Sequence, residues 1–120
     1  MGGLRYGDSK YVRKWGAWKS PYFFKNLSKQ EIVGDYLYYL YYFSERHKNW
    51  KLADECAKKG RELAPESWWT NYMMARTSLR QGNTQQARKC TQKMLEVGYM
   101  APPELLEQLD IEYPNNRWVK

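Results

Sequence analysis

One spacing between matching residues recurs through the middle of this chain. Identical residues stand 34 positions apart at several places, among them Ser44 and Ser78, Ala53 and Ala87, and Cys56 and Cys90. Each copy opens with an aromatic-rich helical segment, continues through a short polar turn, and ends in a second helix with a basic face. A period of this length is typical of stacked helical hairpins. We therefore predict two copies of one helix–turn–helix unit between Ile32 and about Gly98.

Capping and breaking residues predict where the helices begin and end. Residues suited to N-caps precede four expected helices: Ser28, Asn49, Ser67 and Asn83. Glu31 completes a capping box with Ser28, and Gly82 suits a left-handed helix end. The expected helices are 29–45, 50–63, 68–81, 84–97 and 102–109, the last opening on a proline pair that a first turn tolerates.

These signals predict an all-α fold of antiparallel helix-hairpin repeats, a fragment of an α-solenoid with about five helices over residues 28–112. Repeat arrays leave an open apolar end, and the stripe Leu105, Leu106 and Leu109 lets the fifth helix cap the stack. Glycines and Pro21 break any period in residues 1–27, which we expect to be an irregular basic and aromatic arm. Residues 113–120 are expected to be an irregular tail.

The repeat resembles the tetratricopeptide family, which builds helix–turn–helix units of the same period with a small residue at the helix crossing. The matching residues are Leu40, Ala53, Gly60 and Pro65 in the first copy, and Met74, Ala75, Gly82 and Ala87 in the second. The sequence departs from the family pattern at four positions: Tyr41, Ser44, Ser78 and Thr91. The alternative is two unrelated amphipathic helix pairs of similar length.

In the family that the chain resembles, the first helix of each pair lines a concave surface that holds an extended or helical peptide. The resemblance places seven residues on that surface: Asp35, Tyr38, Tyr42, Trp69, Tyr72, Arg76 and Arg80. Tyr, Trp and Arg dominate interface energetics, and arginine suits an acidic segment or a terminal carboxylate. The alternative for Trp69 and Tyr72 is simple packing between repeats.

The basic charge and the aromatic content point to an interaction surface. The formal charge is +7, and residues 1–31 and 67–101 contribute +5 and +4. Thirteen of the twenty aromatic residues fall within the first 43 positions, more than a small core accommodates, so some are expected to be exposed at an interface. Trp15 and Trp18 of the arm are therefore candidate partner-binding residues. The charge is equally compatible with simple solubility, and the arm with folding back over the repeats.

The sequence offers no catalytic constellation. The single histidine, His47, stands in an expected turn, and the two cysteines, Cys56 and Cys90, lie far apart in sequence without neighbouring histidines. We therefore expect no enzyme activity, no cofactor and no metal. We also see neither a secretory signal nor an apolar segment long enough to span a membrane in this sequence, which favours an intracellular location.

The predicted function is a non-catalytic protein–protein interaction module or assembly subunit, with a partner that presents an acidic surface. Two alternatives remain from the same residues. The arm interleaves cations with rings, which suits phosphate contact and base stacking in an RNA-binding or ribonucleoprotein component. The arm's tryptophans and lysines also suit a peripheral subunit of a membrane complex.

Overall fold

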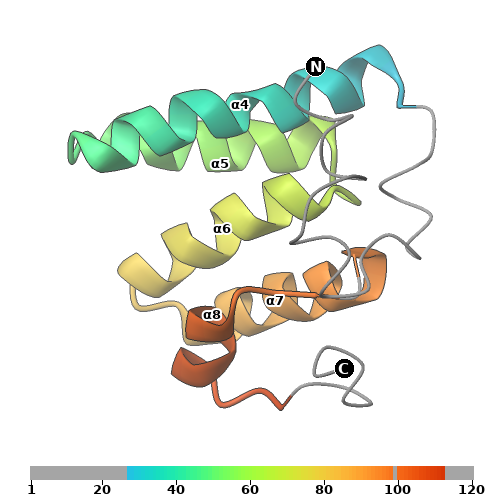
Figure 1. Cartoon of the computed structure of the whole chain (residues 1–120). Helices are drawn as coiled ribbons and strands as arrows, with labels where there is room; N and C mark the ends of the chain where they lie inside the picture. The colour runs from blue at the N-terminus through green and yellow to red at the C-terminus, as the bar shows by residue number, and fades with distance from the viewer. Residues whose placement is uncertain (1–26, 99, 113–120) are drawn as a thin grey trace.

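The chain folds into a stack of helices, described in this computed structural model for residues 27–98 and 100–112 (Figure 1). With the numbering of Figure 1, the helices are α4 (Lys29–Arg46), α5 (Trp50–Leu63), α6 (Trp68–Arg80), α7 (Thr84–Gly98) and α8 (Pro103–Gln108). Helices α4 and α5 form one antiparallel hairpin and α6 and α7 form the next (Figure 1). The described residues contain no strand, so the prediction of an all-α fold of helix hairpins is confirmed.

The helices begin where their capping residues predict. Ser28 Oγ accepts from the N–H of Glu31, and the Glu31 carboxylate accepts from the N–H of Ser28 at 2.8 Å, which is the predicted capping box. Asn49 Oδ1 and Ser67 Oγ cap α5 and α6 by accepting first-turn N–H groups. These side chains replace the hydrogen bonds that a helix start lacks.

Both hairpin turns have the same hydrogen-bond pattern. The N–H of Asn49 donates to the carbonyl of Ser44 at 2.8 Å, and the N–H of Asn83 donates to the carbonyl of Ser78 at the same distance. Each asparagine then caps the following helix through its side chain. The 34-residue period of the amino-acid sequence therefore corresponds to a repeat in the structure.

One left-handed residue reverses the chain in each turn. Gly82 has φ +80°, and Lys48, its counterpart in the first hairpin, has φ +60°. Glycine reaches this region without steric cost, whereas a side chain is disfavoured there. The predicted role of Gly82 is confirmed, and Lys48 occupies the same position with a side chain.

Small residues let the helices of the first hairpin cross closely. A Cβ atom added to Gly34 would lie 2.9 Å from the Ala64 Cβ and 3.2 Å from the Gly60 carbonyl oxygen. Ala53 is fully buried, as is its counterpart Ala87 in the second hairpin. Gly60 was expected at a close approach, but Gly34 carries no signal in the sequence that separates it from an ordinary helical glycine.

The second hairpin fills its interior with large side chains. Trp68 occupies the repeat position of Gly34, is only 2% exposed, and donates its indole N–H to the Met100 carbonyl at 2.9 Å. Met73 and Met94 are fully buried beside it in the same core. Cys90 of this hairpin and its counterpart Cys56 in the first are buried free thiols.

Helix α8 closes the C-terminal end of the described stack. Its predicted apolar stripe is confirmed, because Leu105, Leu106 and Leu109 are each at most 4% exposed. The helix is shorter than expected and is followed by a left-handed residue, Asp110, as α4 and α6 are followed by Lys48 and Gly82. The N–H of Ile111 donates to the Leu106 carbonyl at 2.9 Å, which repeats the bond that closes both turns.

Some expectations need correction, and others fall outside the described residues. Helices α4 and α7 extend to Arg46 and Gly98, and α6 ends at Arg80, each one residue from its expected end. Leu40, which matches the family pattern, is 42% exposed, because no element of the described chain covers that side of the first helix. The expected arm and tail, apart from Leu27, fall outside the described residues.

Candidate functional site

Three aromatic rings meet where α4 crosses α6. The Tyr38 ring centroid lies 4.8 Å from that of Trp69 and 6.0 Å from that of Tyr72. Tyr72 also stacks on the buried Trp68 at 5.4 Å, which anchors the group to the core. All three rings are half-buried, so each presents an edge or face to solvent while resting on a rigid base.

Tyr42 and Arg76 extend this group along the two helices. Tyr42 is 48% exposed, lies 6.2 Å from Tyr38, and accepts a hydrogen bond from Arg46 at 3.2 Å. The Arg76 guanidinium lies 5.8 Å from the centre of the Tyr72 ring. We call the surface formed by Tyr38, Tyr42, Trp69, Tyr72 and Arg76 the inner surface.

Burial keeps the phenols of the inner surface neutral. Desolvation, followed by the neighbouring Tyr72 hydroxyl, raises the pKa of Tyr38 to about 12. Desolvation also raises the pKa of Tyr72, with Arg76 opposing it. Both hydroxyls therefore stay protonated through the physiological range and remain available as hydrogen-bond donors.

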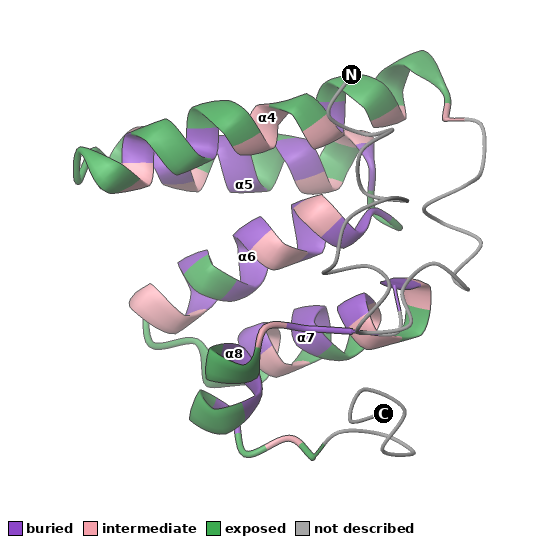
Figure 2. Cartoon of the chain, viewed as in Figure 1, coloured by how far each residue is buried: buried purple, intermediate pink, exposed green. Residues whose placement is uncertain are grey.

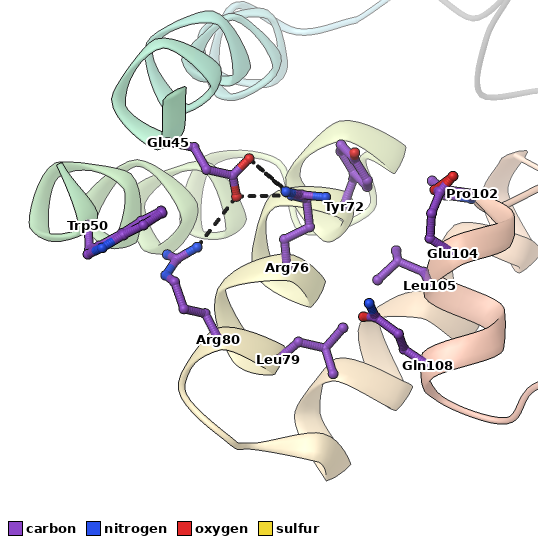
Figure 3. Close-up of a pocket in the computed structure, with 10 residues that line it drawn as sticks. All are labelled: Glu45, Trp50, Tyr72, Arg76, Leu79, Arg80, Pro102, Glu104, Leu105 and Gln108. Atoms are coloured by element: carbon purple, nitrogen blue, oxygen red, sulfur yellow. Dashed lines mark hydrogen bonds and ion pairs between the residues drawn. The ribbon is translucent and has the colours of Figure 1, made fainter. Parts of the chain in front are cut away.

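A single carboxylate organises the cations beside the inner surface. Glu45, near the end of α4, accepts hydrogen bonds from Arg76 Nε at 3.0 and 3.1 Å and forms an ion pair with its Nη2 at 2.9 Å. It also accepts from Arg80 Nη1 at 3.4 Å (Figure 3). The Tyr41 hydroxyl donates a further hydrogen bond to Glu45 at 2.9 Å. Because these partners come from α4 and α6, Glu45 ties the two hairpins together.

Arg80 is fully engaged within the protein. Its guanidinium pairs with Asp54 of α5 as well as with Glu45, and it lies 4.5 Å from the centre of the Trp50 ring. Burial alone would lower the pKa of this arginine, but the hydrogen bonds that it donates to Asp54 raise it, so the cation is held firmly. The role of Arg80 is therefore to stabilise the site through contacts within the protein, more than to bind a ligand directly.

A pocket of about 310 Å³ opens between α6 and α8, beside the inner surface (Figure 3). The first hairpin contributes Glu45 of α4 and Trp50 of α5 to its wall. Its lining residues are Glu45, Trp50, Tyr72, Arg76, Leu79, Arg80, Pro102, Glu104, Leu105 and Gln108. Leu79 and Leu105 add apolar atoms to this otherwise polar lining, so the pocket suits an amphipathic side chain.

The structure brings most of the predicted site residues together. Tyr38, Trp69, Tyr72 and Arg76 form one surface, with Tyr42 at its edge and Arg80 at the far end of the pocket. Asp35 lies apart from the pocket, where its carboxylate accepts a hydrogen bond from Ser67 Oγ at the start of α6. Trp15 and Trp18 lie outside the described residues.

Glu45, Trp50 and the lining residues of α8 were absent from the predicted site. Glu45 is the last acid of an aromatic helix and lies four residues after Tyr41, which is a usable signal for a hydroxyl–carboxylate contact. Glu104 and Gln108 gave no signal, because the path of the chain after α7 decides which face of α8 meets α6.

Charge in the second hairpin is largely matched by the first. Residues 27–112 hold twelve Lys/Arg and twelve Asp/Glu, so the formal excess of +7 resides in residues 1–26 and 113–120. Arg76 and Arg80 pair with acids of the first hairpin, and Lys93 pairs with Glu66 of the connecting loop at 2.6 Å. The basic character of residues 67–101 thus serves contacts inside the protein as well as any partner.

Comparison with protein-family models gives no match, and neither do comparisons with curated proteins and with solved structures. The tetratricopeptide resemblance therefore stays a prediction drawn from the sequence. Over residues 27–98 and 100–112, no group of three or more His, Cys, Asp or Glu residues is arranged to hold a metal ion. In the same stretch no helix has both the length and the hydropathy to cross a bilayer.

Proposed function

We propose that this chain is a non-catalytic interaction subunit that binds a protein partner across its inner surface. The observation that supports this most is the meeting of Tyr38, Trp69 and Tyr72, which are partly exposed and rest on the buried Trp68. Rigid aromatic rings with one wet edge provide large contact area at low entropic cost, and interface hot spots are rich in Tyr, Trp and Arg.

The pocket supplies the second element of recognition. A partner segment that crosses the inner surface reaches the pocket between α6 and α8, where an apolar or amphipathic side chain fits against Leu79 and Leu105. The exposed guanidinium of Arg46 and the 42% exposed side chain of Arg76 favour an acidic group on the partner. The expected partner is therefore an extended or helical protein segment that combines an apolar anchor with a carboxylate.

Site-specific photo-cross-linking tests this proposal in the full-length chain. A photoreactive phenylalanine analogue replaces Tyr42 at the exposed edge of the inner surface, and in a control it replaces the exposed Gln92 on α7. Illumination in an extract of the source cells should give one discrete protein adduct from position 42 and none from position 92. Reconstitution with the identified protein should then lose about tenfold or more in affinity on Tyr42→Ala, a typical hot-spot effect.

The opposite outcomes reject the proposal. Equal adducts from both positions would indicate non-specific contact. A partner retained by Tyr42→Ala, Tyr38→Ala and Arg76→Glu but lost on removal of residues 1–26 would move the binding site to the arm. Adducts to RNA in place of protein would favour the nucleic-acid alternative, whose affinity should fall steeply with salt.

A further inference from the structure

A second surface lies on the other side of α4 from the inner surface. Six large side chains form a continuous strip along it, which we call the outer stripe: Ile32, Val33, Tyr36, Tyr39, Leu40 and Phe43. They are 42–58% exposed, and the Tyr36 and Tyr39 rings meet edge to face at 5.8 Å. Figure 2 shows this exposure along the side of α4 that points away from the other helices.

In the second hairpin, the face equivalent to the outer stripe is buried against the first hairpin. Five of the six equivalent positions of the second repeat are at most 8% exposed in or beside α6: Ser67, Thr70, Met73, Met74 and Thr77. They are covered because the first hairpin packs on them; Gly60 of α5, for example, faces Met73 and Thr70. The outer stripe is therefore the face by which a repeat stacks on the preceding one. Its apolar side chains are larger than most of those at the equivalent positions of the second repeat, and no hairpin among the described residues precedes it.

The two ends of the described stack differ. Helix α8 turns Leu105 and Leu106 inward and exposes Glu104, Glu107 and Gln108, which is the polar exterior that a terminal repeat requires. The α4 end exposes a strip of apolar residues instead. A stack with one closed and one open end cannot extend head to tail, because the closed end offers no stacking face.

We propose that the outer stripes of two copies of this chain pack against each other as an antiparallel, two-fold symmetric dimer. Four members of the stripe have the spacing 4–3–4 along α4, at positions 32, 36, 39 and 43. That spacing is unchanged when the helix is reversed, so Ile32 meets Phe43 and Tyr36 meets Tyr39 across the two-fold axis. A two-fold contact closes on itself, so both open ends are satisfied at once.

The available area matches a modest dimer. A fully exposed aromatic side chain presents about 150–250 Å² of surface. The six side chains of the stripe are each about half exposed, so together they offer on the order of 500–600 Å² per copy. Two copies bury about 1,000–1,200 Å², which is the lower limit for specific interfaces. The dimer is therefore expected to dissociate on dilution in the micromolar range. The stripe does not include the inner surface, so this proposal does not depend on the proposed function.

Sedimentation equilibrium of the full-length chain, over a range from about 1 to 300 μM, measures the association directly. The wild type should convert from monomer to dimer across the range, without larger species. Tyr39→Glu places a charge in the centre of the stripe and should weaken dimerisation about tenfold or more. Tyr42→Glu is the matched control, since it changes the same residue type on the same helix, three positions on, outside the stripe; it should leave the association unchanged.

A charge-complementation experiment tests the antiparallel register. Ile32→Glu and Phe43→Lys should each be monomeric alone, because each places a charge against an apolar side chain. An equimolar mixture should associate at least about tenfold more tightly than either variant, since the glutamate then faces the lysine. Both positions are exposed, and circular dichroism of each variant checks that the fold is retained.

Three results would overturn the proposal. The wild type could stay monomeric throughout the range, which would leave the stripe to residues 1–26 or to a different protein. Tyr42→Glu could weaken association as much as Tyr39→Glu. The mixed variants could associate no better than each alone, which would reject the antiparallel register.

Discussion

The helix crossing of the first hairpin is made by small residues, and the corresponding position of the second holds the largest side chain. Gly34 meets Ala64 and Gly60 in the first, where an added Cβ would lie 2.9 Å from its neighbour. Trp68 takes the place of Gly34 in the second and is 2% exposed. The turns of the two hairpins nevertheless share their hydrogen bonds and their left-handed residue.

This difference shows that the features that define the hairpin are distinct from the side chains that fill the space between its helices. Turn geometry and the buried alanines Ala53 and Ala87 set the hairpin, because both are the same in the two copies. The volume between the helices is free to vary as long as it is filled, since interiors are close-packed whatever the residue. The second hairpin uses that freedom to bury Trp68, which in turn supports Tyr72 of the inner surface.

The largest expected effect comes from removing the side chain that distinguishes the second hairpin. Trp68→Ala leaves a cavity and frees the Met100 carbonyl, so the free energy of unfolding should fall by about 3–5 kcal/mol. Denaturant unfolding measures it. Trp50→Ala, at a tryptophan that is 41% exposed, should cost about 1 kcal/mol or less. Similar losses at both sites would contradict the comparison.

The converse change, a side chain at the small position of the first hairpin, should also destabilise. Gly34→Val forces atoms against Ala64 and the Gly60 carbonyl, and overpacking of this kind costs about 1–3 kcal/mol. The control is the same substitution with Ala64→Gly, which removes the nearest atom and should recover part of the loss. If Gly34→Val has no effect on unfolding, the helices of the first hairpin are not closely packed at this point.

The contact between hairpins rests on Glu45, and its neutral analogue should weaken that contact. Glu45→Gln leaves Arg76 without a matching charge, and Arg80 with Asp54 alone, at a site where Glu45 is only 16% exposed. The expected loss is about 1–2 kcal/mol, less than for a fully buried pair because Arg76 is partly solvated. Glu62→Gln, which breaks the exposed pair with Lys59, should change stability by about 0.5 kcal/mol or less.

Alkaline pH should act mainly through two tyrosines of the first hairpin. Desolvation first, and then Glu45, raises the pKa of Tyr41 to about 12, whereas Ala75 occupies the same position of the second hairpin. Tyr38 has a pKa of about 12 as well. The unfolded chain loses these protons near pH 10 while the folded chain keeps them, so stability is full below pH 10 and falls towards pH 12.

The loss between pH 10 and 12 should be on the order of 1 kcal/mol, because Tyr38 is partly solvated. Unfolding free energies measured through this range test it, alongside tyrosinate absorbance. Tyr41→Phe removes one titrating group and should make the decline shallower. A wild-type stability that stays constant from pH 10 to 12 would show that these phenols are solvated in the folded protein.

The smallest expected effect compares the two turns. Gly82 has φ +80° with nothing within 4 Å of an added Cβ, so Gly82→Ala should cost about 1 kcal/mol through backbone strain alone. Lys48→Gly relieves that strain in the other turn but raises the entropy of the unfolded chain, so the two nearly cancel, within about 0.5 kcal/mol. Equal losses for both changes would mean that the turns are not equivalent.

The sequence by itself determined the local structure of this protein. Capping by Ser28, Asn49 and Ser67 and the turn at Gly82 depend on residues within three or four positions of each other, so they could be predicted from the chain alone. The sequence period added the pairing of helices, because a repeated unit repeats its contacts. Four of the nine predicted site residues, Tyr38, Trp69, Tyr72 and Arg76, were found side by side for the same reason.

Only the tertiary structure decided which surfaces are used up and which stay open. Asp35 and Arg80 have residue types suited to a partner, yet they contact Ser67 and Asp54 from distant parts of the chain. Leu40 and Met74 occupy equivalent positions, and one is exposed and the other buried because only α6 has a hairpin in front of it. The burial of a residue depends on what its helix packs against, and the amino-acid sequence of that helix alone does not contain this information.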